Sequence, residues 1–304
     1  MSFPRPPINL VLLKRPPLEV PYVLDDTVLS VQHMLQRAGY PTLLSYNTID
    51  PRLVNIVFGI YMPGTASIQQ IRALSSPANT VIFNSEQLGS TSPWITDEYL
   101  RLLRDYVCLD YNQANIDHLQ GHWSGQARAF EFPILPSMEF RSDYPMTHER
   151  WQMQYDLAFY GSTANGGRVG RLMELADLGV RLKCFAGSFG RDLPMELMEC
   201  TAVLNIHAYD SALFELGRCL RPAALGMPIF SDVSIHPGKV NWADSGIFFL
   251  PREGFAQSVS AILRDSERML DASQRMLQFV NDAQWPKWAD YIMQQTLFAL
   301  SHGA

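Results

Sequence analysis

One stretch in the second half of the chain constrains the fold more than any other. Residues 202–206 form a short apolar run that ends in polar His207, and residues 227–230 form a second apolar run. The segment between them, residues 212–225, predicts a helix. A strand with a polar tip, a helix and another strand are typical of a parallel α/β sheet, which binds ligands at the carboxyl ends of its strands.

The same alternation runs along most of the 304 residues. In the first half we expect strands at residues 8–13, 42–45, 54–61, 80–83, 106–109 and 130–134, with helices at 25–35, at 97–104 and from 112. In the second half we expect strands at 155–160, 181–185, 202–206, 227–230 and 246–250, with helices at 168–178, 193–199, 212–225, 254–264, 266–280 and 285–300. Strands that alternate with helices indicate parallel, doubly wound sheets.

A stretch rich in Pro, Ser and charge, residues 133–147, predicts a linker between two domains. We therefore expect an α/β fold with two Rossmann-like domains, 1–136 and 137–284, that face each other across a cleft. The last segment, 285–304, is expected to form a helix that packs back across the domains onto the first one. A ligand is expected in the cleft between the domains.

The composition excludes several classes of protein. The formal net charge of −6 leaves no basic surplus for a nucleic-acid backbone, so no nucleic acid is expected as the main partner. No apolar run reaches the length of a membrane span, and the first 22 residues lack the pattern of a signal peptide. The cysteines form no CxxC pair, which indicates reduced thiols of a cytoplasmic protein (Cys108, Cys184, Cys200 and Cys219).

Several short segments together carry a resemblance to a known family: 159–162 followed by Arg168 and Arg171, 205–207, Glu215 with Arg218, 226–228, 231–232, 84–88 and 110–112. On these residues the chain resembles the GT-B glycosyltransferases, and more closely the bacterial group 1 and CgeB-like families. The resemblance covers most of residues 80–235. It implies a metal-independent enzyme of polysaccharide biosynthesis that transfers a hexosyl or related group. The donor would be a nucleotide sugar, the acceptor a glycan or another hydroxyl compound, and no further cofactor is expected.

The helix of the opening stretch departs from this family at one position. Many relatives carry an acid three positions after the helix arginine, where this chain has Arg221. Glu215 is the acid that remains, and a carboxylate can accept two hydrogen bonds from a ribose diol. The alternative for Glu215 is a helix-surface ion pair with Arg218, three residues along. Arg218 is predicted either to neutralise donor phosphate or to hold Glu215 in place.

Other candidates for donor binding lie at turns and strand ends. Gly161 and Ser162 follow a predicted strand and precede a helix, so their backbone N–H groups can face a diphosphate at the helix N-terminus. Arg168 adds positive charge there, although a plain surface turn is the alternative. His207 and Ser231 follow two further strands, where they either contact the phosphate or sugar of the donor or serve only as structural hydrogen-bonding groups.

An inverting transferase needs a carboxylate that takes the proton of the acceptor hydroxyl. Asp26 and Glu86 are the candidates in the first domain, and helix capping is the alternative role for Asp26 and its neighbour Asp25. His118 and His122 have the spacing of metal ligands on one helix, but no third ligand stands nearby in sequence. No metal site is therefore expected.

The sequence thus predicts a cytoplasmic glycosyltransferase. Two alternatives stay open: a sugar-nucleotide epimerase of the same fold, and a non-catalytic carbohydrate-binding or interaction protein. The terminal helix carries Trp285 and Trp288, which allows a peripheral contact with a membrane, but it lacks a basic face.

Overall fold

The computed structural model describes residues 5–19, 22–60, 65–123, 127–141, 153–163, 166–209, 211–234 and 240–302. The chain divides into two compact units. Unit 1 comprises residues 1–135 together with 283–304, and unit 2 comprises residues 136–282. The boundaries expected from the sequence, 1–136, 137–284 and 285–304, differ from these by one or two residues.

A parallel sheet forms the centre of unit 1, with six strands in the order β2-β1-β3-β4-β5-β6. The strands are β1 (Ile8–Leu12), β2 (Thr42–Tyr46), β3 (Val54–Phe58), β4 (Thr80–Asn84), β5 (Val107–Asp110) and β6 (Ala129–Glu131). Every residue of β1, β4 and β5 is buried. Strands that are covered on both faces read as nearly unbroken apolar runs, which is why these three are visible in the sequence.

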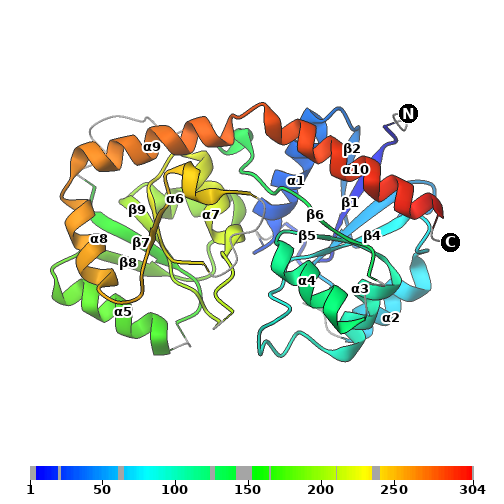
Figure 1. Ribbon diagram of the computed structural model, residues 1–304, viewed down its shortest axis with the longest axis horizontal. Coiled ribbons are helices and arrows are strands. Elements are labelled where there is room, and N and C mark those ends of the chain that lie inside the picture. The colour runs from blue at the N-terminus through cyan, green and yellow to red at the C-terminus, as the bar shows by residue number, and fades with distance from the viewer. Residues whose placement is uncertain are drawn as a thin grey trace. The chain divides into compact units, whose positions relative to one another are not determined.

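The helices of unit 1 lie on the two faces of this sheet (Figure 1). They are α1 (Asp25–Arg37), α2 (Thr65–Leu74), α3 (Asp97–Asp105), α4 (Gln113–His122) and α10 (Gln284–His302). The terminal helix α10 contacts α1, β5 and β6, so it packs on the first domain, whereas α2 contacts α3. Side-chain caps fix two of the helix starts, because Thr96 accepts the N–H of Tyr99 at 3.2 Å and Asn112 accepts that of Ala114 at 2.9 Å.

Unit 2 is also built around a parallel sheet, with five strands in the order β11-β10-β9-β7-β8. These strands are β7 (Tyr155–Tyr160), β8 (Leu182–Phe185), β9 (Cys200–Asn205), β10 (Ile229–Asp232) and β11 (Phe248–Leu250). The α-helices are α5 (Gly166–Asp177), α6 (Leu193–Leu197), α7 (Leu216–Ala224), α8 (Phe255–Leu263) and α9 (Ser266–Val280). Short 3-10 helices are η1 (Met138–Arg141), η3 (Gly190–Asp192) and η4 (Trp242–Ser245). Helix α5 contacts α8, and α7 contacts α9.

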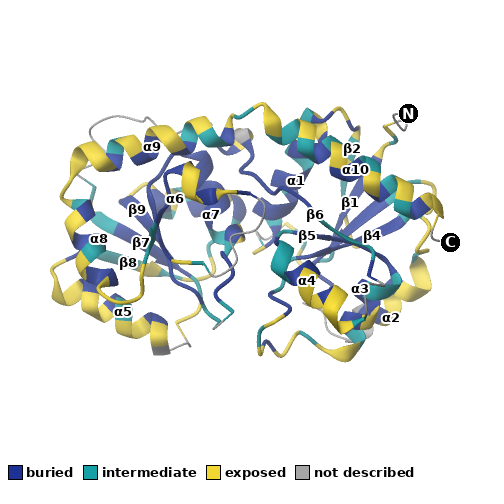
Figure 2. Ribbon diagram, viewed as in Figure 1, coloured by how far each residue is buried: buried dark blue, intermediate teal, exposed yellow. Residues whose placement is uncertain are grey.

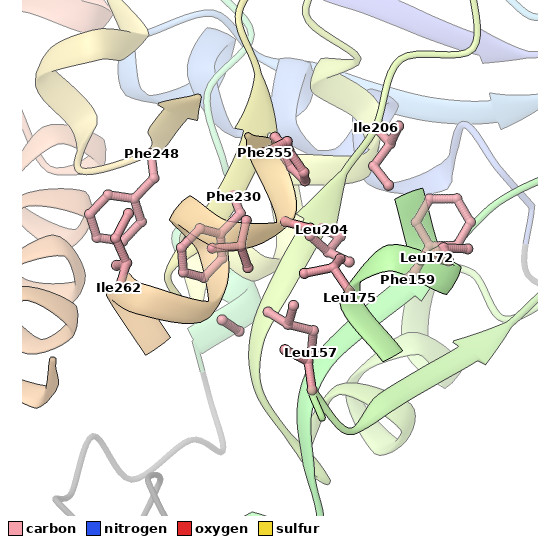
Figure 3. Packing of buried hydrophobic residues seen from close by; sticks show 14 of the residues in the cluster. Leu157, Phe159, Leu172, Leu175, Leu204, Ile206, Phe230, Phe248, Phe255 and Ile262 are labelled. Carbon is pink, nitrogen blue, oxygen red and sulfur yellow. The ribbon is translucent and has the colours of Figure 1, made fainter. Parts of the chain in front are cut away.

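The core of unit 2 joins its strands to α5, α8 and α9 (Figure 3). Leu157 and Phe159 of β7, Leu204 of β9 and Phe230 of β10 belong to this cluster and are at most 1% exposed. Strands β9 and β10 are buried along their whole length (Figure 2). Any side chain that follows these strands therefore starts from a rigid, fully packed sheet.

The structure corrects three expectations about elements. Helix α2 is absent from the predicted pattern, because only Ile68 and Ile71 of the residues with described side chains are buried apolar groups there. Helix α7 begins at Leu216 rather than at residue 212, since Ala212 has a positive φ of 47° that a helix does not allow. The last strand of unit 1 ends at Glu131 rather than at 134. Among the described residues, no helix is both long and apolar enough to span a bilayer.

Candidate functional site

A cluster of charged side chains lies at the carboxyl ends of β7, β9 and β10 in unit 2. Glu215 is at its centre and occupies the N-cap position of α7 instead of the first helical turn. The Oε1 atom of Glu215 accepts from the Ala208 amide at 2.6 Å, and both its oxygens lie 2.8 Å from Nη2 of Arg168. Nη2 of Arg218 lies 2.8 Å from Oε2. One carboxylate therefore holds two guanidinium groups.

The charge state of Glu215 follows from these partners. Burial opposes its ionisation, but the Arg218 and Arg168 guanidinium groups and the Ala208 amide outweigh burial and lower the pKa of Glu215 below its ordinary value. The carboxylate is therefore ionised at neutral pH.

Arg168 and Arg218 form hydrogen bonds with groups at the ends of two different strands, β7 and β9. Nε of Arg168, whose side chain is 3% exposed, donates to the Ile206 carbonyl at 2.8 Å, and its Nη1 donates to the Ser162 carbonyl at 3.0 Å. Nη1 of Arg218 donates to Oδ1 of Asn205 at 3.2 Å. Both guanidinium groups thus have fixed positions beside the turn after β7 and the end of β9.

A glycine and a proline determine how the side chain and the backbone of Arg218 are held. Gly161 has a φ of 141°, which favours glycine, and a Cβ atom there would lie 2.7 Å from Nη2 of Arg218, so a larger residue would displace the guanidinium. Pro222 has no N–H for the Arg218 carbonyl one turn earlier in α7. The hydroxyl of Tyr160 donates to that carbonyl instead. The end of β7 thereby anchors the backbone of Arg218 as well as its side chain.

Replacement of Tyr160 by phenylalanine tests this anchor. We expect Tyr160→Phe to lower the free energy of unfolding by about 1–3 kcal/mol, because the Arg218 carbonyl loses its donor. Tyr155→Phe is the matched control on the same strand, since the Tyr155 hydroxyl accepts only from exposed Gln154 among the described hydrogen bonds. Urea denaturation compares the two variants, and equal stabilities would remove the anchoring role.

A second group of charges lies next to the first. Asp232 is fully buried at the end of β10, and its Oδ2 atom forms an ion pair with Nη1 of Arg171 from α5. Nε of Arg252, which follows β11, is 3.9 Å from the same oxygen. The neighbouring Ser231 accepts from Nδ2 of Asn205 at 2.9 Å, and this bond connects the second group to the one around Glu215.

Among the described residues at this edge, the arginines that form ion pairs outnumber the carboxylates. The ion pairs join four arginines, which are Arg168, Arg171, Arg218 and Arg252, to two carboxylates, which are Glu215 and Asp232. These six groups carry a net charge of about +2 at neutral pH. An edge of a parallel sheet with surplus guanidinium groups can bind a phosphate-bearing ligand.

His207 lies two residues after the end of β9 and is 6% exposed. Neither of its ring nitrogens has a hydrogen-bond partner among the described residues. Burial lowers the pKa of His207, against the opposite effect of the Asp232 and Glu215 charges. The imidazole is therefore neutral at pH 7, with one N–H donor and one acceptor nitrogen.

The structure thus brings together all seven residues predicted for donor binding: Gly161, Ser162, Arg168, His207, Glu215, Arg218 and Ser231. Sequence reasoning assigned no role to Arg252, although its place after the predicted strand 246–250 is the signal that points to it. Arg221 is buried, with its guanidinium carbon 4.2 Å from the centre of the Phe140 ring.

The two predicted catalytic carboxylates lie in unit 1. Asp26 is in the first turn of α1 and is 6% exposed, while its neighbour Asp25 accepts from the Tyr22 amide at 2.7 Å. Glu86 follows β4 and is partly buried. Among the described residues there is no cluster of three or more His, Cys, Asp or Glu that could hold a metal ion.

A buried polar network fixes the backbone at Glu86. Asp110, at the end of β5, accepts from Nδ2 of Asn84 at 2.6 Å and of Asn115 at 3.0 Å. The same two amides donate to the Glu86 carbonyl, at 2.9 and 2.8 Å. Burial raises the pKa of Asp110 to about 7, against the lowering effect of these hydrogen bonds. The segments 84–88 and 110–112 therefore form one hydrogen-bonded substructure.

Comparisons of the sequence give distant relatives only. No protein-family profile matches the chain. Two uncharacterised proteins of Acanthamoeba polyphaga mimivirus are similar to it. One is 29% identical over 181 residues, which are 57% of this chain and 23% of the relative. The other is 27% identical over 169 residues, which are 54% of this chain and 52% of the relative. The matches thus span at most about half the length of these relatives.

Comparisons of the structure are more extensive. WaaG, a glycosyltransferase involved in lipopolysaccharide biosynthesis, has a TM-score of 0.56 at 14% identity, covering 94% of this chain and 99% of its own. T4 phage BGT in complex with its UDP-glucose substrate has a TM-score of 0.57 at 14% identity, covering 95% and 99%. HepE of Anabaena in complex with UDP and glucose has a TM-score of 0.57 at 11% identity, covering 96% and 98%.

The chain has the GT-B glycosyltransferase fold. Its two sheets of six and five parallel strands are the two Rossmann-like domains of that fold. At these sequence identities the likeness concerns the fold, and the chemistry has to be argued from the site itself.

Proposed function

We propose that this chain is a glycosyltransferase that takes its sugar from a nucleoside-diphosphate sugar. The observation that carries the proposal is the surplus of guanidinium groups at the carboxyl edge of the unit 2 sheet. This edge is where parallel α/β sheets bind their ligands. Structures with the same fold contain UDP-glucose or UDP with glucose, so we take UDP-glucose as the first donor to test.

The arginines suit a diphosphate better than any other part of a donor. Guanidinium groups bind phosphate oxygens with charge-assisted hydrogen bonds of about 1.5–3 kcal/mol each. Of the two arginines that Glu215 holds, Arg218 is the better placed, because its side chain is 11% exposed while that of Arg168 is 3% exposed. Guanidinium groups can neutralise the leaving diphosphate without a divalent ion, so we propose a metal-independent transfer with no cofactor beyond the donor.

The geometry supports a positioning role for Glu215. A carboxylate offers about four lone-pair sites, and Glu215 already faces Arg168 with both oxygens, Ala208 with Oε1 and Arg218 with Oε2. A ribose diol would have to displace one of these partners. We therefore propose that Glu215 acts on the donor mainly through the arginines that it holds.

The acceptor side is proposed from the sequence. A glycan or another hydroxyl compound would bind unit 1, and Asp26 or Glu86 would take the proton of the reacting hydroxyl if the enzyme inverts the anomeric centre. The resemblance to group 1 and CgeB-like transferases of polysaccharide biosynthesis supports this direction of transfer. A sugar-nucleotide epimerase of the same fold is the second candidate, because the donor edge would serve both reactions equally.

A thermal-shift measurement on the full chain tests the proposal. At about one hundred times the dissociation constant, UDP or UDP-glucose should stabilise the protein by about 2.7 kcal/mol and raise the melting temperature by roughly 4–10 °C. Uridine, which lacks the phosphates, is the control and should give a much smaller rise. If UDP and UDP-glucose leave the melting temperature unchanged, the donor site does not exist.

Product analysis separates the two reactions. A transferase should form free UDP from UDP-glucose faster when hydroxyl acceptors are added. An epimerase should convert UDP-glucose into an isomeric UDP-sugar without an acceptor. Detection of the isomer would replace the transferase proposal with the epimerase.

A further inference from the structure

Three side chains at the ends of β9 and β10 carry buried polar atoms without a hydrogen-bond partner among the described residues. They are both ring nitrogens of His207, Oδ1 of Asp232 and Oγ of Ser234. His207 is 6% exposed and Asp232 is fully buried. Buried polar atoms are almost always paired, so several unpaired atoms in one place indicate a missing polar occupant.

These side chains are neighbours. Asn205 of β9 pairs in register with Ser231 of β10. His207 is two residues after Asn205, and Asp232 is the residue after Ser231, so both lie at the same end of two hydrogen-bonded strands. The charge and the backbone of Asp232 both act to raise the pKa of the imidazole, so the ring of His207 lies close to Asp232. Ser234 comes two residues after Asp232. The unpaired atoms thus lie at the same end of the β9–β10 pair.

Their chemistry fits hydroxyl groups better than a phosphate. Asp232 is an acceptor with a negative charge, so its free oxygen needs a donor and repels a phosphate. The neutral imidazole of His207 offers one donor and one acceptor, and the Ser234 hydroxyl offers both. A hydroxyl group of a sugar both donates and accepts, and neighbouring hydroxyls on a ring present such groups side by side.

We propose that His207, Asp232 and Ser234 bind the hydroxyl groups of the donor's sugar ring, next to the arginines that bind its diphosphate. The other oxygen of Asp232 pairs with Arg171, so the hydroxyl site and the surplus guanidinium groups share one carboxylate. A nucleoside-diphosphate sugar has hydroxyl groups next to phosphates in the same way, because its sugar ring is attached to the second phosphate. This inference rests on the proposed function and adds which residues recognise the sugar.

Calorimetric titration of UDP and of UDP-glucose measures the sugar's own contribution to affinity. The full chain is compared with the variants Asp232→Asn, His207→Phe and Ser234→Ala. The readout is the preference of each variant for UDP-glucose over UDP, because Asp232 also pairs with Arg171. Asp232→Asn and His207→Phe should reduce the preference for UDP-glucose over UDP by about tenfold, and Ser234→Ala by less. Asp232→Asn retains an oxygen for Arg171, which protects the fold.

Asp244→Asn is the matched control, because Asp244 is exposed and bonds only to Asn241 among the described hydrogen bonds. It should leave both affinities unchanged. If the three variants keep the wild-type preference for UDP-glucose, ordered water fills the site and the inference is wrong, while the proposed function stands. If they weaken UDP and UDP-glucose equally, the residues contact the nucleotide and the inference is also wrong. If the wild type binds neither ligand, the proposed function and this inference fail together.

Discussion

Glu215→Ala is expected to lower the free energy of unfolding by about 3–5 kcal/mol. The reason is the pair of arginines that the carboxylate holds, since Arg168 is 3% and Arg218 is 11% exposed. Without Glu215 two buried guanidinium groups would lie side by side with no opposite charge between them, and the Ala208 amide would lose its acceptor. Urea denaturation followed by circular dichroism measures the loss.

Glu199→Ala is the matched control for this variant. Glu199 is 47% exposed and pairs with Lys183 at the surface, so its removal should cost at most about 1 kcal/mol. Glu215→Gln keeps the shape of the side chain but removes its charge, and it should lose most of the stability that Glu215→Ala loses. A Glu215→Ala protein as stable as Glu199→Ala would show that the arginines do not depend on this carboxylate.

The buried strands could be predicted from the sequence because of how they pack. Strands β1, β4, β5, β9 and β10 are covered on both faces and appear as short apolar runs between helical patterns. Helix α2 could not be predicted in the same way, because Ile68 and Ile71 give too weak an apolar stripe. The fold class could therefore be predicted from the sequence, and the comparisons with solved structures confirm it.

The gathering of these charged side chains at one edge of the unit 2 sheet was also predictable, but the hydrogen bonds between them were not. Glu215 and Arg218 were identified as one pair, because they lie three residues apart. The third partner, Arg168, is 47 residues away in sequence and reaches Glu215 only through the order of the sheet. Side-chain hydrogen bonds between distant residues depend on tertiary packing, which periodicity does not reveal.

The role of Gly161 shows a similar limit. From sequence it is a turn glycine that can bring backbone N–H groups to a phosphate. The structure adds that a Cβ atom at this position would overlap Arg218. Likewise, Pro222 looks like a helix breaker in the sequence, whereas in α7 it frees the carbonyl that binds Tyr160. Both residues act on Arg218 from elements that are far apart in the chain.

Arg218 is the residue on which the account depends most. We expect Arg218→Met to weaken the binding of UDP by about one to two decades, because one charged hydrogen bond of about 1.5–3 kcal/mol is lost. Methionine fills a similar volume, and Glu215 keeps Arg168 and the Ala208 amide as partners. The melting temperature of the variant without ligand shows whether unit 2 is still folded at the temperature of the titration.

Arg181→Met is the matched control, because Arg181 also pairs with one carboxylate, Asp156, but is 54% exposed. Calorimetric titration of wild type, Arg218→Met and Arg181→Met with UDP tests most directly whether the arginine edge of unit 2 binds the donor's diphosphate. The account predicts tight binding by wild type and Arg181→Met, and a loss of about ten- to a hundredfold in Arg218→Met. Equal affinities in all three folded proteins, or no binding by the wild type, would contradict it.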